Sequence, residues 1–331
     1  MSSCFQRAGH FARIVPVIDF RSMFANPALR LVIVQTALLT AFVTTGSAQW
    51  LNYLDPSTPL TPSGKPDLSA KAPRTADGKP DFSGVWQVEP PPPGEIERLY
   101  GKDVSDGPLA VAGDDVNLHS KYFMNLFIDY KKGEEPLTPA ARAAMRRPAQ
   151  PSGQPAAERS QLSYCLPTGT PNRWFYDRPL TIFQTPKQLG IFYEADGAFR
   201  EIHTDGRKLP EDPFPSWTGY SSGHWDGDTL VVDSNGYNER TRLSGGYPHS
   251  ETMRIQERFH RRDFGHLDID ITVIDPVMLT KPVTVKVTEL LLPGSDMVEY
   301  FCAEGEQDAA NMSAIRTATQ KAPTPPVTPR P

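Results

Sequence analysis

Apolar and polar residues alternate one by one through much of the chain after about residue 162, and this period of two limits the possible folds most. Every second residue is aliphatic from Leu267 to Val273, and again from Val283 to Val287. Apolar residues also recur at every second position from Met253 to Ile255, and at Phe259. One buried face and one solvated face are typical of antiparallel sheets. The alternation therefore predicts an all-β domain.

Short glycine-containing turns separate the alternating stretches. Asp196-Gly197 and Asp226-Gly227 are dipeptides typical of tight hairpins, and Phe264-Gly265 and Pro293-Gly294 indicate two more reversals. About ten strands are predicted, near residues 82–88, 180–184, 188–194, 198–203, 222–226, 229–234, 251–262, 266–275, 282–292 and 297–303. Because closure removes exposed strand edges, we expect an antiparallel meander barrel or closed sandwich over residues 161–308, joined by the strand at 82–88.

Proline accounts for 34 of the 331 residues, about twice its usual share, and this argues against long helices. Residues 49–93 are proline-rich, and Thr61–Ser69 recurs in similar form as Thr75–Ser83. An extended arm is expected there. Residues 94–160 carry the helical signals and a loop: Thr138-Pro139 resembles a helix start, and aromatic and aliphatic residues between Tyr122 and Tyr130 fit a second short helix. Residues 309–331 are expected to form a disordered tail.

The first 48 residues resemble an export signal. Arg30 precedes the apolar run Leu31–Val43, which is too short to span a bilayer comfortably, and the small residues Gly46-Ser47-Ala48 suit signal peptidase. We expect cleavage after Ala48, a periplasmic or extracellular location, and no membrane span in the mature chain. An uncleaved anchor is the alternative, and Met23 is a second possible start.

Charge and cysteine content narrow the function. A net charge of −5 gives no electrostatic footprint for nucleic acid. Three cysteines are too few for a disulfide-dense miniprotein or a four-cysteine zinc module. Removal of the signal would leave Cys165 and Cys302, which we predict to form a disulfide in an oxidising compartment, with two separate thiols as the alternative. The oligomeric state stays open.

The connections predict where a ligand would enter. In a meander, successive connections alternate between the two ends. The tight turns at 196–197, 226–227, 263–265 and 293–296 would share one end, and the long connections 204–221, 235–250 and 276–281 the other. Small barrels admit ligands at such an elaborated mouth.

Candidate site residues lie on these long connections and the adjoining strand ends. An acid–base site could use His203, His224 or His249 as base and Arg207 to stabilise an anion. Three histidines could also hold a metal, although we assign none. Ligand contacts are expected from Asp205, Arg207, Trp217, Tyr220 and Ser221. There is a simpler structural interpretation for several of them: Asp205 could orient His203 or form a turn, Arg207 could bind a nearby carboxylate, and His249 could cap a strand.

Glu257 breaks the pattern, because the alternation places it on the same inward face as Ile255 and Phe259. A buried carboxylate needs a charged or hydrogen-bonding partner, or its pKa rises. An internal salt bridge with Arg200 or Arg178 is one interpretation, and a general acid inside a cavity is the other. The chain carries no nucleophile elbow, P-loop, dinucleotide fingerprint, zinc-protease motif or haem attachment motif, so no cofactor is expected.

Two resemblances add expectations about the fold. Gly84-Val85-Trp86 resembles the Gly-x-Trp signature on the first strand of lipocalin-like barrels, and it implies a ligand held in the barrel. The stretch from His203 to Asp233 contains Asp-Gly-Arg and then Ser-Trp-x-Gly-x-Ser-x-Gly-x-Trp-x-Gly-Asp-Thr-Leu-Val-Val-Asp. That stretch is similar to a family of secreted bacterial proteins without an assigned activity, over most of residues 60–305, which implies a shared fold and site but no reaction.

Two functions follow as hypotheses. The first is a secreted or periplasmic binding protein that holds a small, partly apolar or aromatic molecule in the barrel. The alternative is a cofactor-independent hydrolase or lyase with a histidine, carboxylate and arginine site at the mouth. A structural envelope protein, the third possibility, would have a filled interior.

Overall fold

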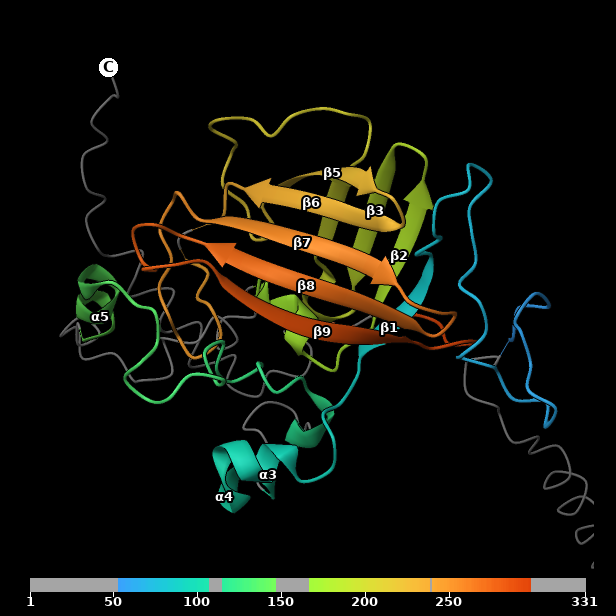
Figure 1. Cartoon of the computed structure of the whole chain (residues 1–331), viewed down its shortest axis with the longest axis horizontal. Coiled ribbons are helices and arrows are strands. Elements are labelled where there is room, and N and C mark those ends of the chain that lie inside the picture. The colour runs from blue at the N-terminus through green and yellow to red at the C-terminus, as the bar shows by residue number, and fades with distance from the viewer. Residues whose placement is uncertain (1–52, 107–114, 147–166, 239, 299–331) are drawn as a thin grey trace, which may run out of the picture. The chain divides into compact units, whose positions relative to one another are not determined.

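Nine β-strands close into one barrel in the computed structural model, which describes residues 53–106, 115–146, 167–238 and 240–298 (Figure 1). The strands are β1 (Gly84–Val88), β2 (Leu180–Thr185), β3 (Gln188–Tyr193), β4 (Phe199–His203), β5 (Tyr220–Asp226), β6 (Thr229–Asn235), β7 (Arg254–Arg261), β8 (His266–Ile274) and β9 (Val283–Leu291). The predicted all-β barrel is confirmed. Most of the predicted tenth strand, at 297–303, lies outside the described residues.

One strand pair departs from the predicted meander. Neighbouring strands are antiparallel throughout, except that β4 and β5 are parallel, with Ile202 paired to Ser221 and His203 paired to Ser222. The connection 204–219 therefore returns along the barrel from the end of β4 to the start of β5 (Figure 1). A parallel pair needs a crossover of about a dozen residues or more, and this connection is long enough.

The parallel pair changes which connections share an end. The turn end, as we name it, carries the connections 186–187, 227–228 and 262–265, and the loop end carries 89–179, 194–198, 236–253 and 275–282. Two expectations were therefore wrong. The turn at Asp196-Gly197 lies at the loop end, and the connection 204–219 belongs to neither end because it joins them.

Large aromatic side chains fill the barrel from both ends. Phe82 enters at the turn end, immediately before β1, and its ring centroid lies 6.2 Å from that of Phe259 on β7. Trp174, in the short 3-10 helix η4 (Asn172–Phe175), enters from the loop end and lies 5.6 Å from the same ring. All three side chains are fully buried. They form an aromatic column inside the barrel.

The proline-rich arm contacts the turn end. Its two repeats fold alike, since Thr61 N–H donates to Lys65 O at 2.8 Å and Thr75 N–H to Lys79 O at 2.9 Å. The first repeat receives backbone hydrogen bonds from the β7–β8 turn, where Gly265 N–H donates to Leu68 O. The second delivers Phe82 to the barrel interior.

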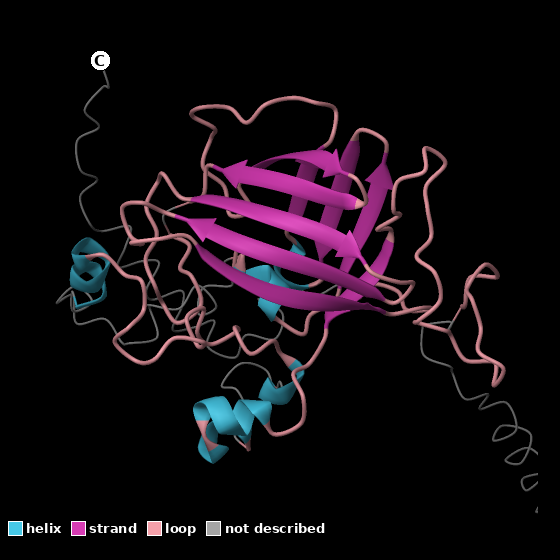
Figure 2. Ribbon diagram, viewed as in Figure 1, coloured by secondary structure: helices cyan, strands magenta, loops and turns pink. Residues whose placement is uncertain are grey.

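The α-helices are short and lie outside the barrel (Figure 2), as the predicted helical insertion requires. They are α3 (Glu95–Tyr100), α4 (Lys102–Ser105) and α5 (Pro139–Arg146), with 3-10 turns η1 (Val116–Leu118) and η5 (Ala195–Gly197). Thr138 caps α5, because its Oγ1 accepts from Ala141 N–H at 3.2 Å. No described helix is long and apolar enough to cross a bilayer.

The prediction of a second short helix between Tyr122 and Tyr130 was wrong. These residues form successive turns instead. Asn125 accepts a hydrogen bond from Phe127 N–H at 2.9 Å, and such local side-chain bonds compete with helix formation. The aromatic residues still pack inward: the Phe127 and Tyr247 ring centroids are 4.5 Å apart.

Candidate functional site

The three candidate histidines do not share one mouth. His203 ends β4 at the turn end, and His224 is exposed on the outer face of β5. His249 lies at the loop end, buried, with Nδ1 3.0 Å from Ser250 O. The expectation of a common mouth was therefore wrong. A meander would make β4 and β5 antiparallel, but they are parallel, so β1 to β4 run opposite to the direction that the meander assigned them relative to β5 to β9. Within the described ranges, no three histidine, cysteine or acidic residues are grouped for a metal.

Four of the predicted residues do meet, but on the outer surface. The His203 and Tyr220 ring centroids are 5.3 Å apart, and Arg207 Nη1 lies 3.4 Å from Tyr220 Oη. Arg207 also donates to Asp205, with Nη2 2.6 Å from Oδ2, and these bonds lower the pKa of Asp205 to about 2. Arg207 thus binds a carboxylate of its own chain, as the simpler interpretation of that residue expected.

Ser221 and Glu257 lie inside the barrel instead. Glu257 forms a fully buried ion pair with Arg200, whose Nη1 is 2.9 Å from Oε1, and Trp174 Nε1 donates to the same oxygen at 2.7 Å. Arg200 Nε donates to Ser221 Oγ at 3.1 Å, and Nη2 to Ser234 Oγ at 2.9 Å. The internal salt bridge is confirmed, with Arg200 as the partner.

Trp217 lies where the predicted mouth was expected. It is half-buried at the loop end, its carbonyl accepts from Thr170 N–H at 3.2 Å, and the Arg240 guanidinium carbon lies 5.6 Å from its ring centroid. The predicted Cys165–Cys302 disulfide, the signal at 1–48 and the tail at 309–331 all lie outside the described residues.

Glu289 is a buried acidic residue that the sequence interpretation did not single out. It continues the inward-facing series of Val283, Val285 and Val287 on β9, and it is 1% exposed. Burial raises the pKa of this carboxyl well above its ordinary value of 4.5. The alternation in the sequence could have indicated this residue, because Glu289 is the next inward-facing position after Val287.

Replacing Glu289 is expected to change how stability depends on pH. Because the folded-state pKa is raised, its contribution to stability is fully present below the unfolded pKa and is lost as pH rises toward the folded value. Glu289→Gln should therefore reduce the fall in melting temperature between about pH 5 and pH 8. Thermal melts across that range test this, with Glu201→Gln, at an exposed position on β4, as control. Equal slopes for wild type and Glu289→Gln would contradict it.

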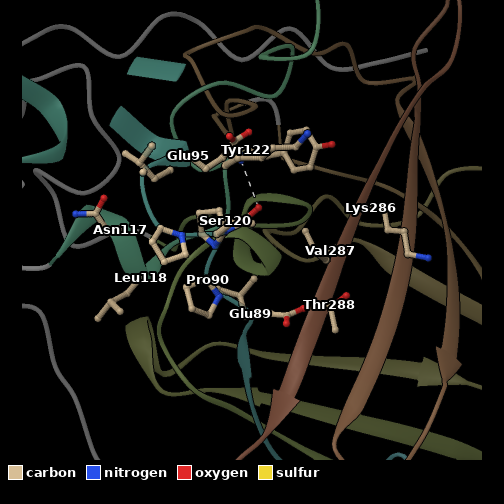
Figure 3. A pocket seen from close by; sticks show the side chains of 17 residues that line it. Glu89, Pro90, Glu95, Asn117, Leu118, Ser120, Tyr122, Lys286, Val287 and Thr288 are labelled. Atoms are coloured by element: carbon tan, nitrogen blue, oxygen red, sulfur yellow. Dashed lines mark hydrogen bonds between the residues drawn. The ribbon is translucent and has the colours of Figure 1, made fainter. Parts of the chain in front are cut away.

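A groove of about 980 Å³ lies beside β9, where β1 ends and the chain leaves the barrel (Figure 3). The lining comes from the segments 88–96 and 117–122 and from β9. The lining residues are Val88, Glu89, Pro90, Pro91, Pro92, Pro93, Gly94, Glu95, Ile96, Asn117, Leu118, Ser120, Lys121, Tyr122, Lys286, Val287 and Thr288. None of the residues predicted for the site lines it.

The groove combines a buried apolar base with a polar rim. Val88, Ile96 and Tyr122 are almost fully buried. Tyr122 Oη donates to Asp129 Oδ2 at 2.7 Å, and Lys121 Nζ lies 2.7 Å from Oδ1 of the same carboxylate, so the segment 117–122 is held in place. Burial and the neighbouring Asp129 raise the pKa of Tyr122, which keeps its hydroxyl neutral.

Proximity in the fold creates this groove, and no local motif indicates it. The prolines at 90–93 were interpreted only as part of the arm, and the aromatic residues near 122 only as a helix face. Glu89 N–H donates to Thr288 O at 2.7 Å, a bond that joins segments 199 residues apart. Only this long-range pairing brings the proline segment beside β9.

The comparisons with known proteins give no relative to reason from. No family model, no curated protein and no solved structure matches the chain. The resemblances drawn from the sequence therefore stay expectations. Function has to be argued from the site, because a barrel alone does not determine what a protein does.

Proposed function

We propose that the chain is a binding protein for a small, partly apolar molecule, held in the groove beside β9. One observation carries this proposal: the groove encloses about 980 Å³ between an apolar base and a polar rim. Pockets that hold drug-sized molecules are concave, mostly apolar and of roughly this volume.

The groove is a better place for such a ligand than the barrel interior. Phe82, Trp174 and Phe259 occupy the interior as the aromatic column, and the Arg200–Glu257 pair fills space beside them. A ligand in the barrel would have to displace these close-packed groups. The groove needs no such displacement.

The lining indicates what the ligand should look like. The prolines at 90–93 offer apolar surface for a ring or a short chain. Glu89 and Lys286 make no ion pair within the part of the chain that the structure describes, so either charge is open to a polar substituent. We expect a ring-sized molecule with one polar group. Export, as residues 1–48 suggest, would make it a periplasmic or extracellular ligand.

Filling the groove should abolish binding. We expect Thr288→Trp to weaken binding of the fluorescent probe 1-anilinonaphthalene-8-sulfonate about tenfold or more, because the indole would occupy the groove beside β9. A fluorescence titration of the folded protein measures this. Thr284→Trp is the matched control, because Thr284 also points outward from β9 but does not line the groove.

The two substitutions disturb the sheet alike. Thr288 Oγ1 donates to Asp268 at 2.8 Å, and Thr284 Oγ1 shares a 2.8 Å hydrogen bond with Thr272, so each change removes one bond to β8. Circular dichroism should show that both variants keep the wild-type fold. If the wild type leaves the probe free, or if both variants bind it equally, the groove is not the site.

A further inference from the structure

Three exposed phenylalanines stand in a row on the outer face of β2, β3 and β4. Phe183, Phe192 and Phe199 are 60%, 48% and 60% exposed. The ring centroids of Phe183 and Phe192 lie 5.6 Å apart, and those of Phe192 and Phe199 lie 6.4 Å apart. The three rings therefore form one continuous patch, which we name the phenylalanine row. None of them lines the groove.

Strand pairing fixes the order of the rings. Phe192 lies directly opposite Phe199, and Phe183 lies directly opposite Gly190. Because Gly190 has no side chain, the Phe183 ring can reach the Phe192 ring, which it meets edge to face at 83°. Such cross-strand aromatic contacts stabilise a sheet, but here they leave about half of each residue exposed. The contacts within the sheet therefore do not account for the row, which keeps surface for a partner.

The wall formed by β7, β8 and β9 has the opposite composition. Arg258, Asp270 and Lys286 are in register there, so charges of alternating sign face outward. The outward positions of β2, β3 and β4 include one acidic residue, Glu201, and no lysine or arginine. Gln188 Nε2 donates to Glu201 Oε1 at 2.8 Å, so this carboxylate also has a partner. An outer face rich in aromatic residues and poor in charge is typical of an interaction surface.

The charge of the chain favours a second copy as the partner. The net charge is −5, so charged surfaces of two copies tend to repel each other. A two-fold contact brings each group close to its own counterpart, and a patch of uncharged rings avoids that repulsion. Phe192 lies in the middle of the row. An axis near Phe192 would place Phe183 of one copy against the partner's Phe199.

The area of the row suits a weak dimer. Aromatic side chains bury roughly 150–250 Å² each, so at these exposures the row offers about 300 Å² per copy and about 600 Å² in a pair. The smallest specific interfaces bury about 1,000–1,200 Å², of which roughly 60% is apolar. Two rows therefore supply most of the apolar area that a reversible dimer needs, and too little for a permanent one.

We propose that the phenylalanine row is a self-association surface, and that the protein forms a reversible two-fold dimer in which the row of one copy packs on the row of the other. The inference does not depend on a ligand in the groove, because the row and the groove share no residue.

Analytical ultracentrifugation of the full chain over about 1–100 μM tests this proposal. We expect the mean mass to rise from monomer toward dimer. Phe192→Glu should raise the dissociation constant about tenfold or more, because each new carboxylate would face its counterpart near the axis. Tyr53→Glu, 67% exposed on the arm, is the matched control and should associate like wild type. Residues 1–48 are identical in all variants, so association through them would not respond to either change.

A second variant separates association from folding. Phe183→Thr/Phe199→Thr adds no charge, keeps residues suited to strands, and should also weaken the dimer about tenfold or more. Circular dichroism should show the wild-type fold in both variants. A wild type that stays monomeric throughout would overturn the proposal, as would equal dissociation constants for the wild type and both variants. A monomer that binds phosphatidylcholine vesicles through Phe192 would also overturn it, and would assign the row to a lipid surface.

Discussion

Arg200→Met is expected to destabilise the protein by about 3–5 kcal/mol, because it leaves the Glu257 carboxylate buried without its ionic partner. Both side chains are fully buried, and the guanidinium donates to both carboxylate oxygens. The Trp174 indole N–H would remain, but one neutral donor does not offset a buried charge. Ser221 and Ser234 would also lose a donor each.

Urea unfolding followed by tryptophan fluorescence measures this cost. Arg207→Met is the matched control, because Arg207 forms an ion pair with Asp205 on the surface, where solvent screens it. That variant should unfold like wild type. The double variant Arg200→Met/Glu257→Met should regain much of the lost stability, since apolar residues of similar volume can replace a buried ion pair. Equal midpoints for Arg200→Met and Arg207→Met would refute the assignment.

Phe82→Ala is expected to cost about 3–5 kcal/mol, the usual loss for a large-to-small change at a packed aromatic site. Phe82 is fully buried, and its ring contacts both Trp225, at 5.5 Å between centroids, and Phe259, at 6.2 Å. Removing it would open a cavity at the turn end and release the arm from its deepest contact. The prediction therefore makes the arm part of the folded domain.

The same unfolding experiment tests this effect. Phe214→Ala is the control, because that ring is 93% exposed and its loss should change stability by about 0.5 kcal/mol or less. Proteolysis of the folded Phe82→Ala variant should also cut first within residues 53–83, since the arm loses its anchor. A Phe82→Ala midpoint equal to that of Phe214→Ala would mean that the arm contributes little to the barrel.

Most of the strands could be predicted because their information is local. Alternation within β8 and β9 reflects which side of a single strand meets the core, and a side-chain period of two is fixed by strand geometry. A hairpin turn such as Gly227-Asp228 joins two strands that are consecutive in the sequence, so the short connection forces these strands to pair. Glu257 could be placed inside for the same reason. Its partner Arg200 could be named as one of two candidates, because the alternation does not give distances across the barrel.

The site could not be predicted, because it depends on how distant segments meet. A strand shows the same alternation whether it runs up or down, so nothing local in β5 indicates that it lies parallel to β4. Because β5 runs parallel to β4, His203 lies at the turn end and His249 at the loop end, so the residues predicted for one mouth are divided between the two ends of the barrel. The groove likewise exists only because residues 89–96 return beside β9.

The sequence by itself determined most of the strands, their inward faces and the all-β class, since each rests on contacts between near neighbours and on the two-residue period. Only the tertiary structure decided the pairing of β1 with β9, the direction of β5, the partner of Glu257 and the groove. The physical reason is common to all four. Each is a juxtaposition of side chains far apart in the chain, selected by the packing of the whole barrel and carried by no single segment.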